Sequence, residues 1–430
     1  MTVIDATPPS VKGWCPGALR PMPSGDGLIV RIRISGGRLA LDDLRAIAAL
    51  GRRCGSGAFD LSQRANLQMR GISDAMLPEV HDELRKLGLL PADVGIEQIL
   101  NIVAPPLAGV DPDALIDVCA LVAQIEEMLR ADQRLRLLPG KFGFVVDDGG
   151  ALSTTGVDAD IALEAMRSHG KVEIALRLAG DSGQAARVPP ERAVAAAGAL
   201  ARAFLTLRDE CEAGRMRAAV AALGADAVFA RAGLSNAPLT RRAPVAMRNV
   251  FGAHPLGEAA FVGCGAPYGR WRADDLERLA DRVDSAGGRT LRLTPWRAIL
   301  APGLDAGRAA SLAAKLGRDG LIVDGADLRL AIAACPGAPD CPSASVRTHE
   351  AADSFVHLFA GAAPGLRLHV AGCEKGCAHP RPAPLTLVGR GGRFDLVLNG
   401  APGGVPAATG LDLAGAHCAL AQRMRHVPPS

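Results

Sequence analysis

Alternating apolar and basic side chains mark the first regular element of the chain. Aliphatic residues occupy every second position between 27 and 34, and Arg31 and Arg33 lie among them. This period of two predicts a half-buried strand. The spacing of apolar residues then changes to that of a helix over 42–53, which Gly55 is expected to end.

Two further strands and a second helix complete this unit. Residues 59–61 and 67–69 again have the composition of strands. Helical spacing resumes after Ser73, which we expect to cap a helix that runs to about Leu87 and ends at Gly88. The order of these elements predicts a compact β-α-β unit with an added helix, which is one half of a ferredoxin-like fold.

The same unit returns in the second half of the chain. A single gapless shift aligns Gly37-Arg38 with Gly269-Arg270, Asp42-Asp43-Leu44 with Asp274-Asp275-Leu276, and Gly55 with Gly287. The match predicts a duplicated half-domain. One half alone would leave a face of its sheet bare, whereas two halves can bury each other's faces.

Two longer modules surround the second repeat, so the predicted fold class is α+β, with duplicated ferredoxin-like half-domains plus two α/β modules. The predicted boundaries are 15–90 for the first half-domain, 91–235 for the first α/β module, 236–310 for the second half-domain and 311–430 for the second α/β module.

Within the α/β modules the pattern predicts both helices and strands. In the first module we expect helices over 112–130 and 190–207, a turn over 138–144, a strand over 171–178, and a linker or helical hairpin over 219–236. In the second module we expect strands near 366–370, 385–389 and 394–398, and helices near 345–360 and 411–424.

Composition narrows the class of protein. A chain of 430 residues with 49% hydrophobic and only 3% aromatic side chains should form two or more closely packed domains. The net charge of +3 does not indicate nucleic-acid binding. We expect no export signal and no membrane span. The 10 cysteines then favour the reducing cytoplasm and a metal-binding role for some of them.

Four of these cysteines form two close pairs, Cys335 with Cys341 and Cys373 with Cys377. Four thiolates can hold a polynuclear iron–sulfur centre, and the prolines and glycines around them keep the chain out of regular helix. Ordinary buried thiols, disulfides and a zinc site are the alternatives, although structural zinc usually has pairs separated by two to four residues. Spacing alone favours an iron–sulfur centre and leaves the alternatives open.

These cysteine pairs resemble the cluster signature of the sulfite and nitrite reductase superfamily. Two further stretches, 14–27 and 293–297, resemble the precorrin-3B synthase branch of that superfamily. The resemblance implies a nitrite/sulfite reductase-like fold and a [4Fe–4S] cluster held by Cys335, Cys341, Cys373 and Cys377. In the reductases the cluster lies beside a sirohaem, and the last cysteine bridges the two.

A row of hydrogen-bond donors lies just before and within the third predicted strand. On a strand, Arg64, Asn66, Gln68 and Arg70 would share one face. Guanidinium groups bind carboxylates bidentately, although a solvated strand face fits the pattern equally well. The run resembles the reductase motif that holds sirohaem and its anionic ligand. The resemblance implies that Arg64, Gln68 and Arg70 bind a tetrapyrrole substrate, with Arg70 standing where the reductases have histidine.

Three other positions correspond to anion-binding groups of the reductases, and two of them carry a different residue. The chain keeps Lys141, but Gly143 replaces the second family lysine and Leu100 replaces an arginine. Each missing charge-assisted hydrogen bond would cost about 1.5–3 kcal/mol, so reduction of sulfite or nitrite is disfavoured. In the second repeat, Arg297 is a further candidate carboxylate ligand beside Trp296. A core tryptophan next to a surface arginine is the alternative.

The resemblance to precorrin-3B synthases implies oxygen-dependent hydroxylation of precorrin-3A at C-20, with γ-lactone formation. It implies O2 as a substrate and NADH as an indirect reductant, through an electron-donating reductase. A mononuclear non-haem iron is a further implied cofactor, for which His254, His369 and His379 are available. Sirohaem binding, a sirohaem-dependent sulfite or nitrite reductase, and a non-catalytic tetrapyrrole carrier are the alternatives.

Overall fold

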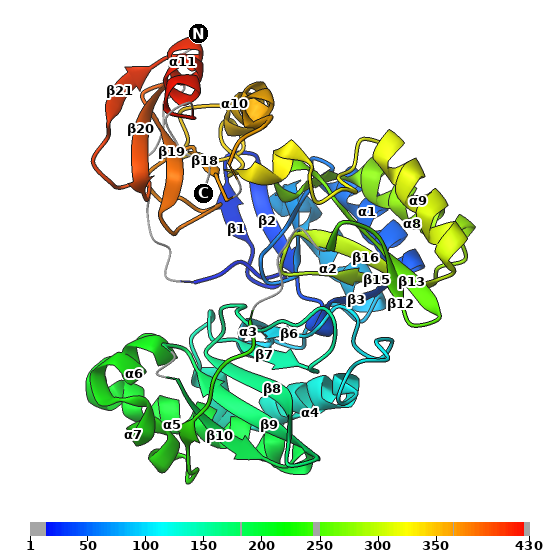
Figure 1. Ribbon diagram of the computed structural model, residues 1–430, viewed down its shortest axis with the longest axis vertical. Helices are drawn as coiled ribbons and strands as arrows, with labels where there is room; N and C mark the ends of the chain where they lie inside the picture. Colours follow the sequence, from blue (N-terminus) through cyan, green and yellow to red (C-terminus); the bar gives the residue numbers. More distant parts are fainter. Residues whose placement is uncertain (1–13, 181–182, 244–249, 364, 425–430) are drawn as a thin grey trace.

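Four β-sheets organise the protein, which we describe from a computed structural model (Figure 1). The structure describes residues 14–180, 183–243, 250–363 and 365–424. The first half-domain contains β1 (Met22–Ser24), β2 (Gly27–Ile32), β3 (Arg38–Ala40), α1 (Leu41–Cys54), β4 (Ala58–Leu61), β5 (Leu67–Ile72) and α2 (Leu77–Lys86). The predicted cap by Ser73 is wrong, because its side chain makes no capping bond and a short 3-10 turn precedes α2.

The second half-domain repeats this order of elements. It contains β12 (Gly252–Leu256), β13 (Ala259–Gly265), β14 (Arg270–Arg272), α8 (Ala273–Ser285), β15 (Thr290–Leu293), β16 (Ala298–Leu304) and α9 (Ala306–Arg318). An unusual backbone conformation also recurs at matched positions. Ala65 (φ 54), between β4 and β5, and Arg297 (φ 61), between β15 and β16, are both left-handed. The gapless shift found in the sequence therefore aligns equivalent elements.

The two half-domains exchange their short third strands. Strand β14 of the second half pairs antiparallel with β4 of the first, and β3 of the first pairs antiparallel with β15 of the second. The two sheets are therefore β1-β2-β5-β4-β14 and β12-β13-β16-β15-β3. Helices α1 and α8 pack against each other, and one hydrophobic core contains residues from both halves. Each half thus supplies an edge strand and core surface to the other.

Each α/β module has a sheet with parallel strands at one edge. The first sheet, β11-β10-β9-β8-β7-β6, is parallel from β6 to β8 and antiparallel beyond. The second, β17-β18-β19-β20-β21, is parallel from β17 to β19. The bounds are β6 (Ile102–Val103), β7 (Phe144–Asp147), β8 (Ile161–Ser168), β9 (Lys171–Leu178), β10 (Gln184–Val188), β11 (Ala237–Pro238), β17 (Ile332–Ala334), β18 (Leu368–Ala371), β19 (Ala383–Arg390), β20 (Arg393–Gly400) and β21 (Ala408–Leu411).

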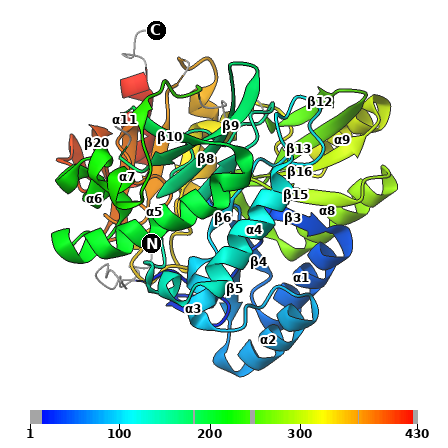
Figure 2. The same cartoon turned by 90° about the horizontal axis from the view of Figure 1, so that it is seen from below.

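Helices cover these sheets. Figure 2 shows α4 (Val118–Ala131) and α5 (Ala193–Cys211) side by side against the first of them. The helix predicted over 112–130 begins later than expected, because the Asp117 side chain caps it by accepting from the backbone N–H of Cys119. Of the two alternatives for 219–236, the helical hairpin is correct. The remaining helices are α3 (Val94–Ile99), α6 (Met216–Leu223), α7 (Ala225–Arg231), α10 (Thr348–Phe355) and α11 (Leu413–Met424).

The fold class is α+β, as predicted, with helices and mostly antiparallel sheets combined in each part. Figure 1 shows the second α/β module at the upper left, the first α/β module at the bottom and the paired half-domains to the right. None of the helices in the described ranges is long and apolar enough to cross a membrane.

Candidate metal centre and cationic cavity

The loops that carry the two cysteine pairs leave the same edge of one sheet. Cys335 directly follows β17, and Cys373 follows β18 after Gly372. These strands are parallel neighbours, with Ala334 beside Val370. Carboxyl ends of parallel strands lie at the same edge, so two segments that are far apart in sequence carry their thiols to one place.

The pKa values of these thiols show that they face a common space. Burial raises the pKa of Cys335 to about 11, against the hydrogen bonds from the backbone of Gly372 and Gly337, and the nearby Cys377 and Cys341 contribute to the increase. Burial also raises the pKa of Cys373 and of Cys377, and in both cases Cys341 adds to the effect. Cys341 and Cys377 therefore lie within electrostatic reach of each other and of both other thiols, and a bound metal would have to stabilise the thiolate form.

The surroundings of the thiols fit a cluster of metal ions. The backbone N–H of Gly372 donates to Cys335 Sγ over 3.1 Å, a contact typical of thiolates that hold iron–sulfur clusters. A Cβ atom on Gly372 would lie 2.6 Å from that of Ala344 and 3.4 Å from Cys335 Sγ, so only glycine fits there. Cysteine, histidine and carboxylate side chains of the described residues nowhere form a group of three close enough for a single metal ion. All 10 cysteines are free thiols.

A cleft lies between the first half-domain and the first α/β module, and some of its lining residues differ in type from those of the reductases. Its walls include Arg64, Asn66, Leu100, Asn101 and Gly143. The two residues that stand in place of family cations, Leu100 and Gly143, therefore face the same cleft as Arg64. The substitutions leave this cleft less positively charged and less crowded at that wall.

Arg33 contacts Asn101, one of the residues that line this cleft. Its Nη1 donates to Asn101 Oδ1, but its buried Nε and Nη2 have no hydrogen-bond partner among the described residues. Burial, together with the charges of Arg31 and Arg64, lowers the pKa of Arg33 to about 10, against the opposite effect of Glu97. A buried guanidinium group with unused donors is costly, so this is a place where an anionic ligand would be stabilised.

Arg64 is not on the predicted strand. It lies in the turn between β4 and β5, because Ala65 adopts a left-handed conformation and Ser62 and Asn66 close the turn. Arg64 Nη2 donates to the backbone oxygen of Lys141 over 2.8 Å. The expectation of one continuous strand face is therefore wrong for Arg64.

Lys141 connects the cleft with the cysteine loops. Burial raises the pKa of the Cys377 thiol, and the positive charges of Lys375 and Lys141 oppose this increase. Lys141 is therefore close enough to act electrostatically on the last cysteine, while its backbone oxygen holds Arg64.

Comparison with known proteins identifies the family. The nitrite/sulfite reductase ferredoxin-like half-domain model matches residues 20–87 and 254–318. A precorrin-3B synthase from Sinorhizobium sp is 33% identical over 92% of this chain and 85% of its own length. The chain belongs to the nitrite and sulfite reductase superfamily, on the precorrin-3B synthase branch.

Further relatives are nitrite reductases. The ferredoxin–nitrite reductase of Synechococcus elongatus is 27% identical over 87% of this chain and 78% of its own length. The solved structure of the NirA protein of Mycobacterium tuberculosis matches 93% of this chain and 80% of that chain, with a TM-score of 0.74 and 20% identity. This structural match supports the superfamily fold.

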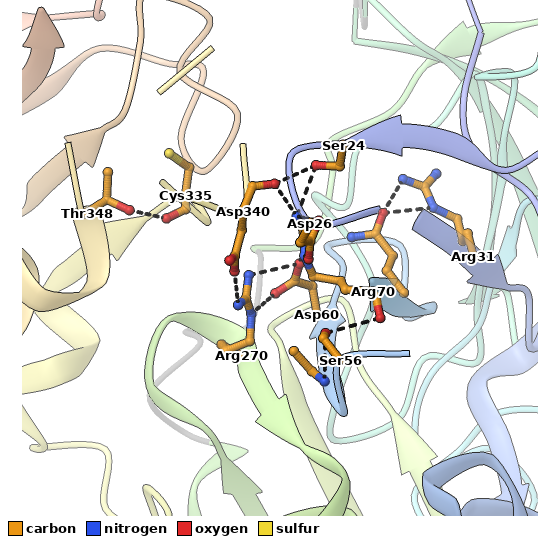
Figure 3. Close-up of polar contacts among 12 residues, drawn as sticks. Ser24, Asp26, Arg31, Ser56, Asp60, Arg70, Arg270, Cys335, Asp340 and Thr348 are labelled. Carbon is orange, nitrogen blue, oxygen red and sulfur yellow. Dashed lines mark hydrogen bonds and ion pairs between the residues drawn. The ribbon is translucent and has the colours of Figure 1, made fainter. Parts of the chain in front are cut away.

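The other candidates for substrate binding differ in what they contact. Gln68 Oε1 accepts from Arg31 Nε and Nη2 at 3.2 and 2.7 Å, so it orients that arginine. Arg70 is only 2% exposed and donates to Asp26, Asp60, Ser24 and the backbone oxygen of Asp340 (Figure 3). The donors of Arg70 are thus engaged inside the protein.

A second group of unused donors lies beside the cysteine loops. Arg297 Nε is buried, and so are both ring nitrogens of His369; none of the three has a partner in the part of the chain that the structure describes. Burial lowers the pKa of His369 to about 4, and His379 and Arg297 add to this effect. The rings of His369 and His379 meet edge-on at 5.9 Å. Arg297, His369 and His379 therefore lie close to one another, and His369 lies beside Gly376 of the second cysteine loop.

Of the three histidines that were candidate iron ligands, His254 lies apart from His369 and His379. His254 instead bonds the backbone oxygen of Phe251 at 2.8 Å and stacks on Phe261. Arg31 and Arg33 were not among the predicted site residues, although their alternation with apolar residues on a half-buried strand was a usable signal. Arg33, just after β2, is buried and keeps two N–H groups without partners among the described residues.

Proposed function

We propose that this chain is an oxidoreductase that hydroxylates precorrin-3A at C-20 with γ-lactone formation, as a precorrin-3B synthase of aerobic cobalamin biosynthesis in the cytoplasm. One observation supports the proposal most directly: buried N–H groups of Arg33 and Arg297 lack hydrogen-bond partners among the described residues. A tetrapyrrole with many peripheral carboxylates would supply acceptors to both arginines at once, which a small oxyanion could not do.

The chain's own residues would orient the substrate. Arg33, Arg64, Lys141 and Arg297 would bind its carboxylates, and Gln68 would hold Arg31 in the same region. Because the four meso carbons of the macrocycle are chemically similar, only a fixed orientation can select C-20. Arg70 would not bind the substrate directly, since its own N–H groups already have acceptors. It would act through its contacts with Asp60.

Cys335, Cys341, Cys373 and Cys377 would hold a [4Fe–4S] cluster, and the N–H group of Gly372 supports that assignment. The cluster would supply electrons one at a time. NADH would deliver them through a partner reductase, and O2 would supply the hydroxyl oxygen. A mononuclear iron remains part of the proposal, with His369 and His379 as the nearest candidate ligands.

A sirohaem-dependent nitrite or sulfite reductase is the second candidate function, favoured by the nitrite reductase relative. Leu100 and Gly143 count against it. A Cβ atom on Gly143 would lie 3.9 Å from Arg64 Nη1, so a lysine side chain there would enter the cleft beside Arg64. Without that lysine and the family arginine, a small oxyanion would lose two charge-assisted donors.

Incubation of the purified holoprotein with precorrin-3A, a reductant and isotopically labelled O2 tests the proposal. We expect one labelled oxygen atom in the C-20 hydroxyl group of a lactone product, detected by mass spectrometry. Reduction of nitrite or sulfite without any change in precorrin-3A would instead support the second function. An absorption spectrum with sirohaem bands would point the same way.

A further inference from the structure

The loop that carries the first cysteine pair is attached to both half-domains at one residue. Asp340 immediately precedes Cys341. Its backbone oxygen accepts from Ser24 Oγ at 2.6 Å, from the N–H of Gly25 at 3.1 Å and from Arg70 Nη2 at 2.8 Å. Its carboxylate accepts from Arg270 Nη1 at 2.7 Å. Figure 3 shows these contacts converging on Asp340 from separate strands.

Asp60 joins the two arginines that hold this loop. It accepts from Arg70 Nη1 at 3.2 Å and from Arg270 Nε at 2.5 Å. Asp60 faces Arg270 in the register of β4 and β14, so the strand exchange between the half-domains brings them together. Asp26 adds two bonds to Arg70 at 2.9 Å.

Burial makes this network stronger than a surface ion pair. The side chains of Arg70, Arg270 and Asp60 are 2%, 16% and 17% exposed. Charge-assisted hydrogen bonds in such surroundings are short and directional, and loss of one partner leaves a buried charge unpaired. The network therefore restrains the Cys341 end of the loop far more than a solvated pair could.

We infer that Arg70, Asp60, Arg270 and Asp340 form a loop clamp, a set of positioning residues that fixes Cys341 relative to the other three thiols. The inference rests on the proposed four-cysteine centre. It gives Arg70 a role that differs from substrate binding: the side chain at this position holds the metal-binding loop against the half-domains. The clamp requires strands from both repeats, so it exists only after the half-domains have paired.

A glycine beside the clamp allows a test that changes no charge. Gly25 has no left-handed φ, but a Cβ atom there would collide with the backbone oxygen of Pro339 and approach Asp340. Gly25→Ala should therefore push the loop away from Ser24 and Arg70. Gly403→Ala is the matched control, since Gly403 also lacks a left-handed φ and a Cβ atom there meets nothing within 4 Å.

Iron and acid-labile sulfide content, the reduction potential and the rate of bleaching in air should all be measured on anaerobically purified proteins. We expect Gly25→Ala to lose its cluster several-fold faster in air and to show a shifted potential, while Gly403→Ala matches the unaltered chain. Asp340→Asn, which keeps the backbone acceptor but weakens the pair with Arg270, should give a smaller change in the same direction. If Gly25→Ala does not fold, the Asp340→Asn variant provides the test of the clamp.

Hydrogen–deuterium exchange over residues 335–342 of cluster-free protein separates the clamp from the proposed function. Faster exchange there in Gly25→Ala, with unchanged thermal unfolding, would support the clamp even if precorrin-3A were not a substrate. Equal exchange, cluster content and potential in Gly25→Ala and Gly403→Ala would overturn it.

Discussion

Two buried arginines show that a residue's role here depends on which acceptors it meets. Arg70 and Arg33 are 2% and 7% exposed. Arg70 lies among Asp26, Asp60 and the oxygen of Asp340, so its charge is balanced internally. Arg33 has one amide acceptor and two unused N–H groups within the described structure. The first arginine therefore contributes to structure, whereas the second is available to a ligand.

The cysteine assignment gives a prediction for single residues. Cys341→Ala should abolish the iron–sulfur absorption and acid-labile sulfide, because three thiolates cannot complete a four-cysteine set. Cys119→Ala should leave both unchanged, since Cys119 is exposed on α4. Iron and sulfide analysis of the two variants checks this. Retention of the full cluster by Cys341→Ala would show that the four-cysteine assignment is wrong.

The unused donors of Arg33 give a second prediction. Arg33→Met should raise the KM for precorrin-3A about tenfold or more, because charge-assisted hydrogen bonds contribute about 1.5–3 kcal/mol each. Thermal stability of the ligand-free protein should change little, since the change removes repulsion with Arg31 and Arg64 but also removes a positive charge that stabilises the buried Glu97 carboxylate. Arg318→Met, an exposed change on α9, is the control and should alter neither value. A destabilised Arg33→Met variant with unchanged KM would contradict the prediction.

At the scale of elements, the exchange of β3 and β14 makes two repeats into one folding unit. Each short strand completes the sheet of the opposite repeat, and Trp271 on β14 lies opposite Phe59 on β4. Trp271 is fully buried. The exchanged strand β14 therefore contributes a core side chain as well as backbone hydrogen bonds to the first half-domain. It stabilises that half-domain although it is only a short strand.

Trp271→Ala should consequently destabilise both half-domains. Removal of a buried tryptophan typically costs ~3–5 kcal/mol. Urea unfolding should show the loss, and hydrogen–deuterium exchange should increase over 58–72 in the first repeat as well as in the second. Trp296→Ala removes a half-buried tryptophan from a separate cluster and should have a smaller effect, without faster exchange over 58–72. Faster exchange confined to the second repeat would argue against the shared unit.

At the scale of the whole molecule, the candidate site draws on all four modules. Arg33 and Arg64 come from the first half-domain, Lys141 from the first α/β module, Arg297 from the second half-domain, and the cysteines from the last module. The loop clamp extends across the same boundaries, since Arg70 and Asp340 are 270 positions apart. A site of this kind depends on how the modules pack, so a change in packing alters the metal centre and the cavity together.

The sequence by itself indicated the main helices and strands, the duplication and the cysteine spacing. These features are local or periodic: alternation reports a buried strand face, and the repeat preserved Gly55 and Gly287 at equivalent positions. It also identified the superfamily, because short motifs carry the resemblance. The α+β class followed from the order of the elements.

Only the tertiary structure decided which charges are paired. Sequence spacing placed Arg64, Gln68 and Arg70 on one strand face, but the left-handed Ala65 put Arg64 in a turn, and Asp26, Asp60 and Asp340 engaged Arg70. The strand exchange was equally invisible, because pairing within a repeat and pairing between repeats require the same sequence pattern. The physical reason is that a side chain's free energy depends on its partners, and those partners come from distant parts of the chain.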